Sequence, residues 1–240
     1  ELLLAHDQGP RTPVAFLAVD VSNGADVLIA RSPIESPAGL RGKRVGVEPE
    51  SLGILLLSRA LERAGLGLSD VTLHWTDGAA IADAFRRSEI DAVVTYPPHA
   101  LPILEAGGRT IFSSADIPGE IVDVIMIDAE RLRQRPGDAQ RVIDGFRRAQ
   151  DYLRAHPDEA VSIMAGREGV TPAAFRQALE NGIDMLAPDD QGAVLAPGGS
   201  AERALRELER VMRRIGLVTG PGCRAGCIAD PSTLLARGGD

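Results

Sequence analysis

Binding chemistry is best supported where a short apolar strand gives way to a Leu-rich helix. The strand is predicted over residues 44–47 and the helix begins near residue 52, so the junction between them holds Glu50, Ser51, Leu52 and Gly53. The first N–H groups of a helix have no partner inside it, and the helix dipole places partial positive charge at that end. Such a junction can hold an anion or a polar group without a catalytic side chain.

Three further polar residues also adjoin predicted strands. Ser22 and Asn23 lie in a turn that precedes an apolar strand at residues 27–30, and Tyr96 directly follows a strand at 92–95. Each candidate has an ordinary structural alternative. Asn23 can be only a turn former, Ser51 only a helix cap, and Tyr96 a half-buried core residue.

Metal, redox and nucleophilic chemistry find little support in the residue spacing. No metal site and no cofactor are predicted, because none of the histidines has an i,i+4 or His-x-His partner; they are His6, His74, His99 and His156. Cys223 and Cys227 are separated by three residues, which favours a small structural disulfide over a metal ligand pair or a reactive thiol. No Gly-x-Ser-x-Gly segment and no Ser/His/Asp arrangement is present, so no catalytic residue is predicted.

The elements that must position these residues alternate between strand and helix. Strands are predicted over residues 14–19, 27–30, 44–47, 71–75, 92–95, 110–113 and 122–127, with helices over 52–64, 79–87 and 98–106. This alternation implies right-handed crossovers and a mainly parallel sheet. Beyond residue 136 the pattern is helical, with helices predicted over 138–155, 158–165 and 172–181 and a last one that Ser200 caps and Gly216 ends.

Composition excludes several classes of function. The chain has 240 residues, of which 44% are hydrophobic, and a net charge of −8. That charge argues against a nucleic-acid surface. The 3% aromatic content argues against a platform for stacked bases. No apolar run approaches the roughly 20 residues that a membrane-spanning helix needs.

An ordered series of segments resembles one known family. The series comprises residues 22–26 (Ser-Asn-Gly-Ala-Asp), 40–48 (Leu-Arg-Gly-Lys-Arg-Val-Gly-Val-Glu), 85–98 (a helix end, a strand and Tyr-Pro-Pro) and 113–120. It resembles the extracytoplasmic solute-binding proteins of ABC importers, in the nitrate, sulfonate, taurine and thiamine-precursor branch. The similarity extends over roughly residues 1–220.

The resemblance implies an α/β, two-lobed periplasmic-binding-protein fold of type II with parallel-rich sheets. Residues 1–40 and 121–218 would form the first lobe, residues 41–120 the second, and residues 219–240 an irregular tail. In the family a further strand-helix-strand unit precedes the segment that residues 1–6 resemble. We therefore expect the first lobe to be incomplete and the chain to be N-terminally truncated.

The resemblance also implies a function. It predicts a non-enzymatic component of an ABC importer that captures a small polar or anionic organic solute in a cleft between the lobes. Family positions map the ligand contacts onto Ser22, Asn23, Tyr96 and the helix junction from Glu50 to Gly53. The partners would be the small-molecule ligand and the membrane permease subunits, in a periplasmic or extracytoplasmic location. No nucleic acid and no direct membrane insertion are expected, and any lipid anchor would belong to the missing N-terminal part.

Two other functions use the same fold. Lyase-type enzymes of menaquinone-precursor synthesis and pyrimidine synthases need a polar catalytic set or a sacrificial histidine, and only His99 lies near a family motif. Effector-sensing domains of transcription regulators follow a DNA-binding helix-turn-helix. The upstream gene sequence separates these alternatives from transport.

Overall fold

The computed structural model describes residues 2–8, 12–49, 52–223 and 226–229. The strands are β1 (Pro13–Ser22), β2 (Val27–Ala30), β3 (Arg44–Val47), β4 (Thr72–Trp75), β5 (Ala92–Thr95), β6 (Arg109–Ser113), β7 (Val122–Asp128) and β8 (Ile183–Met185). The α-helices are α1 (Leu2–Gln8), α2 (Gly53–Arg63), α3 (Gly78–Arg86), α4 (Leu101–Glu105), α5 (Ala129–Gln134), α6 (Pro136–Ala155), α7 (Pro157–Glu168), α8 (Pro172–Asn181), α9 (Gln191–Leu195) and α10 (Ser200–Arg214).

The chain divides into two compact units. Unit 1 comprises residues 1–21, 122–180 and 184–240, and unit 2 comprises residues 22–121 and 181–183. The sequence assigned residues 22–40 to the first lobe. The structure places them in unit 2, because β2 pairs antiparallel with both β5 and β6.

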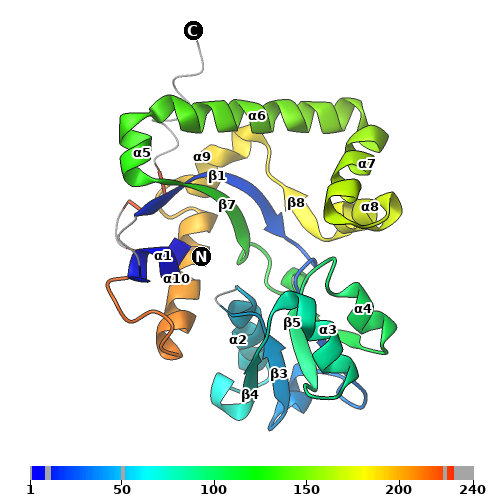
Figure 1. Ribbon diagram of the computed structural model, residues 1–240. Coiled ribbons are helices and arrows are strands. Elements are labelled where there is room, and N and C mark those ends of the chain that lie inside the picture. Colours follow the sequence, from blue (N-terminus) through cyan, green and yellow to red (C-terminus); the bar gives the residue numbers. More distant parts are fainter. Residues whose placement is uncertain (1, 9–11, 50–51, 224–225, 230–240) are drawn as a thin grey trace. The chain divides into compact units, whose positions relative to one another are not determined.

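Unit 2 is built on a five-stranded mixed sheet in the order β4-β3-β5-β2-β6 (Figure 1). β3 pairs in parallel with β4 on one side and β5 on the other. These short strands are rich in Val and Ala and are flanked by turns, a composition typical of strands covered on both faces. At the starts of two of them, the Arg44 guanidinium donates to both carboxylate oxygens of Asp91, at 3.0 Å from Nε and 2.8 Å from Nη2.

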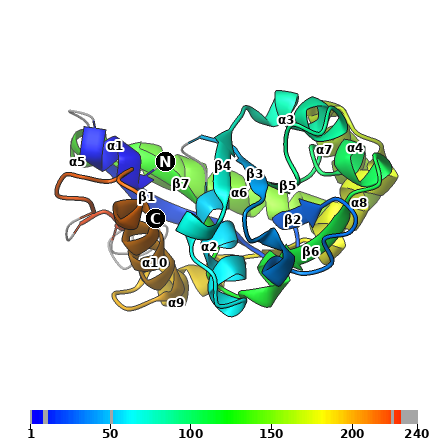
Figure 2. The same cartoon turned by 90° about the horizontal axis from the view of Figure 1, so that it is seen from below.

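Helices cover both faces of this sheet (Figure 2). Strand alternation points Ile29 and Val93 to one face, where they pack against α3 and α4. On the other face α2 packs against β2 and β5 through a fully buried run, Ile54, Leu55, Leu56 and Leu57. The Leu-rich start of α2, which marks the predicted junction, is therefore part of the unit 2 core.

Unit 1 is built on a three-stranded sheet in the order β7-β1-β8, in which β1 and β7 run antiparallel. Phe16 and Leu17 of β1 pack against Ala139 and Ile143 of α6. Ala18 packs in a separate cluster with residues of α9 and α10. In Figure 1, α6 runs along one side of this sheet and α10 lies on the other.

The predicted α/β class with parallel strands is confirmed, and most predicted elements are present. Several local features differ from the predictions, among them α9, which was not predicted. The helix predicted over 98–106 is shorter (Leu101–Glu105), Gly199 rather than Ser200 is the N-cap of α10, and α5 and β8 were not predicted. Among the described residues, no helix is long and apolar enough to cross a membrane.

Gly108 is held where a side chain cannot fit. A Cβ at this position would lie 2.6 Å from Cγ2 of Ile29 and 2.8 Å from the backbone oxygen of Ile103. We therefore expect Gly108→Ala to lower the free energy of unfolding by about 1–3 kcal/mol. Urea denaturation followed by fluorescence of Trp75, the only tryptophan, measures this change. The control is Gly67→Ala, with its nearest contact at 3.7 Å and an ordinary φ of −122°. Equal stability of the two variants would contradict the packing argument.

The Arg44–Asp91 pair predicts a pH dependence of stability. The hydrogen bonds from Arg44 hold the pKa of the Asp91 carboxyl below its ordinary value of 3.8. A lowered pKa in the folded state stabilises the protein above the unfolded pKa, and this stabilisation is lost as pH falls through the folded pKa. We expect Asp91→Asn to cost about 0.5–1 kcal/mol at pH 7, because the pair is partly exposed, and much less at pH 3. Urea denaturation at both pH values tests this, with Asp83→Asn on the exposed face of α3 as the control. A cost that is the same at both pH values would rule out the pair as its source.

Candidate functional site

Polar groups gather at the edge of the unit 2 sheet where its three parallel strands end. β3 is followed by Glu48, β4 by residues 76–78, and β5 by residues 96–99. Because β3 is parallel to both neighbours, these segments leave the sheet at the same edge, where ligands bind in open α/β sheets. We call residues 48–49, 52–53, 76–78 and 96–99 the carboxyl edge.

Glu48 and His99 converge on Gly78. The point where a side chain would begin at Gly78 lies 3.3 Å from Oε1 of Glu48 and 3.4 Å from Nε2 of His99. A carboxylate and an imidazole from two different strand ends therefore approach the first residue of α3. The lack of a side chain at Gly78 allows both groups to approach this closely.

Aromatic side chains lie beside this pair. The ring of Tyr96 contacts that of His99 edge to face, with centroids 5.6 Å apart and an interplanar angle of 81°. Tyr96 is 41% exposed and Trp75, at the end of β4, is 43% exposed. Large aromatic side chains that are this exposed suit contact with a ligand, because their flat faces and polar tips serve both apolar and polar groups.

The carboxyl edge combines acidic side chains with the starts of two helices. Its segments contain Glu48 and Asp77 but no Lys or Arg. α2 and α3 both begin here, at Gly53 and Gly78, and the start of a helix favours negative charge. The edge therefore suits a ligand that carries both a hydrogen-bond donor for a carboxylate and an acceptor for helix N–H groups.

Two of the predicted junction residues, Leu52 and Gly53, lie at this edge. Leu52 is the half-buried N-cap of α2 and Gly53 is its buried first residue. Glu50 and Ser51 lie outside the described residues. Tyr96 directly follows β5 and lies at the edge. The ligand contacts of all of these residues stay predictions.

Ser22 and Asn23 lie instead in a tightly bonded turn. The Ser22 hydroxyl is buried and donates to Oγ of Ser114 at 2.8 Å, and the backbone N–H of Gly24 donates to the same oxygen at 2.6 Å. The backbone N–H of Asn23 donates to the carbonyl of Gly182 at 2.8 Å. Asn23 itself is exposed. The structure gives Ser22 a role in holding the turn, and the ligand role predicted for both residues stays a prediction.

Geometry adds three candidates, Glu48, Gly78 and His99, to those that the sequence singled out. The sequence carried one signal for them, because Glu48 directly follows a strand and His99 closes the segment Tyr-Pro-Pro-His after another. Only the parallel pairing of β3 with β4 and β5 shows that they meet.

The turn from residue 22 to 26 predicts a difference between two serine variants. Ser114→Ala removes the acceptor of the buried Ser22 hydroxyl and of the Gly24 N–H, so we expect it to lower the free energy of unfolding by about 1–3 kcal/mol. Ser22→Ala leaves the bond from Gly24 to Ser114 in place. It also removes the acceptor of the Asp26 N–H, but that bond is long at 3.3 Å, so this variant should cost less. Urea denaturation of both variants measures the two costs. A larger loss for Ser22→Ala than for Ser114→Ala would contradict this hydrogen-bond arrangement.

Comparison with known proteins identifies relatives of the chain. A putative binding protein of Brucella abortus is 29% identical over 182 residues, covering 72% of this chain and 56% of the relative. The taurine-binding periplasmic protein of Escherichia coli is 26% identical over 226 residues, covering 90% of this chain and 69% of that one. The chain thus spans little more than half the length of the first relative.

The chain is also similar to solved structures and to an enzyme. The periplasmic aliphatic sulphonate binding protein SsuA of Escherichia coli matches 96% of this chain and 75% of its own at 19% identity, with a TM-score of 0.73. At that identity the match shows the fold alone. A 2'-hydroxybiphenyl-2-sulfinate desulfinase of Rhodococcus erythropolis is 25% identical over 199 residues, covering 61% of this chain and 54% of the enzyme.

The match to a family model includes the whole carboxyl edge. The model is described as NMT1/THI5 like and matches residues 2–160, well over half of the chain. This match confirms the family that the sequence resemblance predicted. The chain belongs to the NMT1/THI5-like family.

Proposed function

We propose that this chain is the solute-binding part of an ABC importer and captures a small polar or anionic organic solute of the sulfonate, nitrate, taurine or thiamine-precursor type. The observation that carries the proposal is the convergence of Glu48 and His99 on Gly78 at the carboxyl edge, in a chain of this family. Most of the relatives are binding proteins, which supports capture rather than conversion. A membrane permease would be the partner, in a periplasmic or extracytoplasmic location.

The chemistry of the edge favours a solute with two unlike ends. A carboxylate accepts hydrogen bonds and attracts positive charge, so Glu48 would take an N–H-bearing group of the solute. The start of α2 would take an acidic group, because its N–H groups and dipole favour an anion. Tyr96 would cover the apolar part between them. An aminosulfonate has this arrangement, whereas a simple alkanesulfonate lacks the group that Glu48 would bind.

A pair of matched ligands tests whether the site prefers an aminosulfonate. We expect taurine to raise the melting temperature of the chain more than ethanesulfonate, which has the same acid group and no amine. The shift arises because a ligand selective for the folded state stabilises it. Nitrate, bicarbonate and aminopyrimidines complete the panel. If no solute of the panel shifts the melting temperature, the proposal fails.

Matched variants locate the site. Glu48→Gln should weaken taurine binding at least about tenfold in calorimetry, since a hydrogen bond to a charged group contributes about 1.5–3 kcal/mol, and should leave ethanesulfonate binding nearly unchanged. Tyr96→Ala should weaken the binding of both taurine and ethanesulfonate. The controls are Glu89→Gln, which removes a carboxylate paired with Arg87, and His74→Ala on β4. If the edge variants bind like these controls, the ligand lies elsewhere.

The desulfinase relative supports a second candidate, an enzyme that acts on a sulfinate. Incubation of the chain with 2'-hydroxybiphenyl-2-sulfinate separates the two functions. Binding without consumption of the compound supports capture, and its consumption over many turnovers supports the enzyme.

A further inference from the structure

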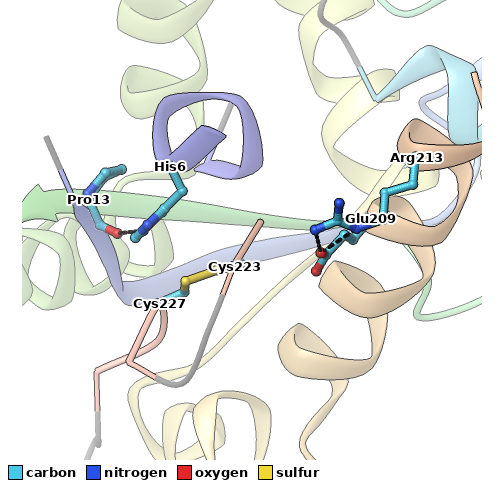
Figure 3. Close-up of a disulfide and its surroundings, with 6 residues drawn as sticks. All are labelled: His6, Pro13, Glu209, Arg213, Cys223 and Cys227. Atoms are coloured by element: carbon cyan, nitrogen blue, oxygen red, sulfur yellow. Dashed lines mark hydrogen bonds and ion pairs between the residues drawn. A yellow bond between two sulfur atoms is a disulfide. The ribbon is translucent and has the colours of Figure 1, made fainter. Parts of the chain in front are cut away.

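Three ligand-type side chains from distant parts of the sequence meet in unit 1. They are His6 of α1 and the pair Cys223 and Cys227, and one nitrogen or sulfur atom from each lies within 4.8 Å of the others. The two cysteines form a disulfide. Figure 3 shows it close to the strand that begins at Pro13, with His6 above it. We call these three residues the His–Cys–Cys cluster.

Backbone contacts hold the cluster in place without the disulfide. The N–H of Ala15 in β1 donates to the carbonyl of Cys227 at 2.8 Å, and the N–H of Ala229 donates to the carbonyl of Ala15 at 2.8 Å. Asp7, next to His6, accepts from the N–H groups of Thr219 and Gly220 at 3.0 and 2.6 Å. Opening the disulfide would therefore leave both segments attached to the same strand and helix.

The imidazole is oriented as metal-binding histidines usually are. Nε2 of His6 lies 2.6 Å from the carbonyl oxygen of Pro13. A carbonyl only accepts hydrogen bonds, so the His6 ring donates to it from Nε2. Metal-binding histidines typically donate their other N–H to a carbonyl or carboxylate in this way, which fixes the ring and raises its basicity.

The cluster is reachable from solvent. A cavity of about 380 Å³ is lined by His6 and Cys227, together with Gly222 and Gly226 of the tail. His6 and Cys223 are half-buried, whereas Cys227 is buried. A small reductant and a cation can therefore enter, and there is room for a fourth, non-protein ligand. Three protein ligands with one open position is a coordination that Zn²⁺ adopts with two cysteines and one histidine.

We propose that the His–Cys–Cys cluster is a redox-gated site for a thiophilic divalent cation, of which Zn²⁺ is the probe. A dithiol reductant transfers two electrons and two protons to the disulfide, giving the two thiols and the oxidised cyclic disulfide of the reductant. Zn²⁺ then displaces both thiol protons and bonds to the two thiolates and to the imidazole of His6, with no change in its own oxidation state. Two thiolates offset the charge of the cation, so the site needs no further acidic group.

The test compares the oxidised and reduced forms of the full chain. The protein is reduced with dithiothreitol, freed of it by gel filtration under nitrogen, and titrated with Zn²⁺ against a chromophoric chelator. We expect one Zn²⁺ per chain in the reduced form and at least hundredfold weaker binding in the oxidised form. Co²⁺ in place of Zn²⁺ should give thiolate-to-metal charge-transfer absorption. Equal binding by the two forms overturns the proposal.

Variants assign the ligands. Cys223→Ser and Cys227→Ser should each abolish stoichiometric binding. His6→Gln keeps an N–H that can donate to Pro13, so the fold is preserved, and should weaken Zn²⁺ binding by the reduced chain at least tenfold. The control His156→Ala removes an exposed histidine of the same unit and should change nothing. Binding by His6→Gln at the level of this control would exclude the imidazole and overturn the three-ligand site. None of these residues lies at the carboxyl edge, so solute binding is a separate readout.

Discussion

The parallel pairing of β3 with both β4 and β5 is the constraint on which the candidate site depends. Since the three strands run in one direction, their amino ends meet at one edge and their carboxyl ends at the other. The ion pair of Arg44 with Asp91 joins two strands at the amino edge. At the opposite edge the same alignment brings Glu48 and His99 to Gly78. If β3 ran in the opposite direction, Glu48 would lie at the amino edge, away from His99 and Gly78.

The sequence predicted those parts of the fold that depend on short-range pattern. The strands at residues 27–30, 44–47 and 92–95 were predicted at their observed bounds, because each is a brief apolar run between turn residues. Tyr96 was chosen instead from the family resemblance, in which an aromatic residue before a Pro pair lines the cleft. The position of β2 between β5 and β6 was not predicted, because antiparallel pairing with later strands leaves no mark in the periodicity of the strand itself.

Contacts between distant residues explain what the sequence could not show. No spacing rule joins His6 to Cys223, because such rules search for ligands within one helix, hairpin or loop. Asp7 and Thr219, which are 212 residues apart, bond only because α1 and the tail both lie against β1. For a similar reason the sequence could not show that Glu48 and His99 both approach Gly78, because these two residues follow different strands.

The pairing of β1 also affects the time at which this part of the protein can form. Its partner in the antiparallel pair, β7, begins at Val122, so the ribosome must add the whole of residues 23–121 first. At usual rates of synthesis this takes on the order of 5 to 20 s. During that interval Val14, Phe16 and Leu17, all buried in the finished protein, belong to a strand without its neighbour. Unpaired apolar strands can associate with other chains, so β1 is exposed to such association for the whole of this interval.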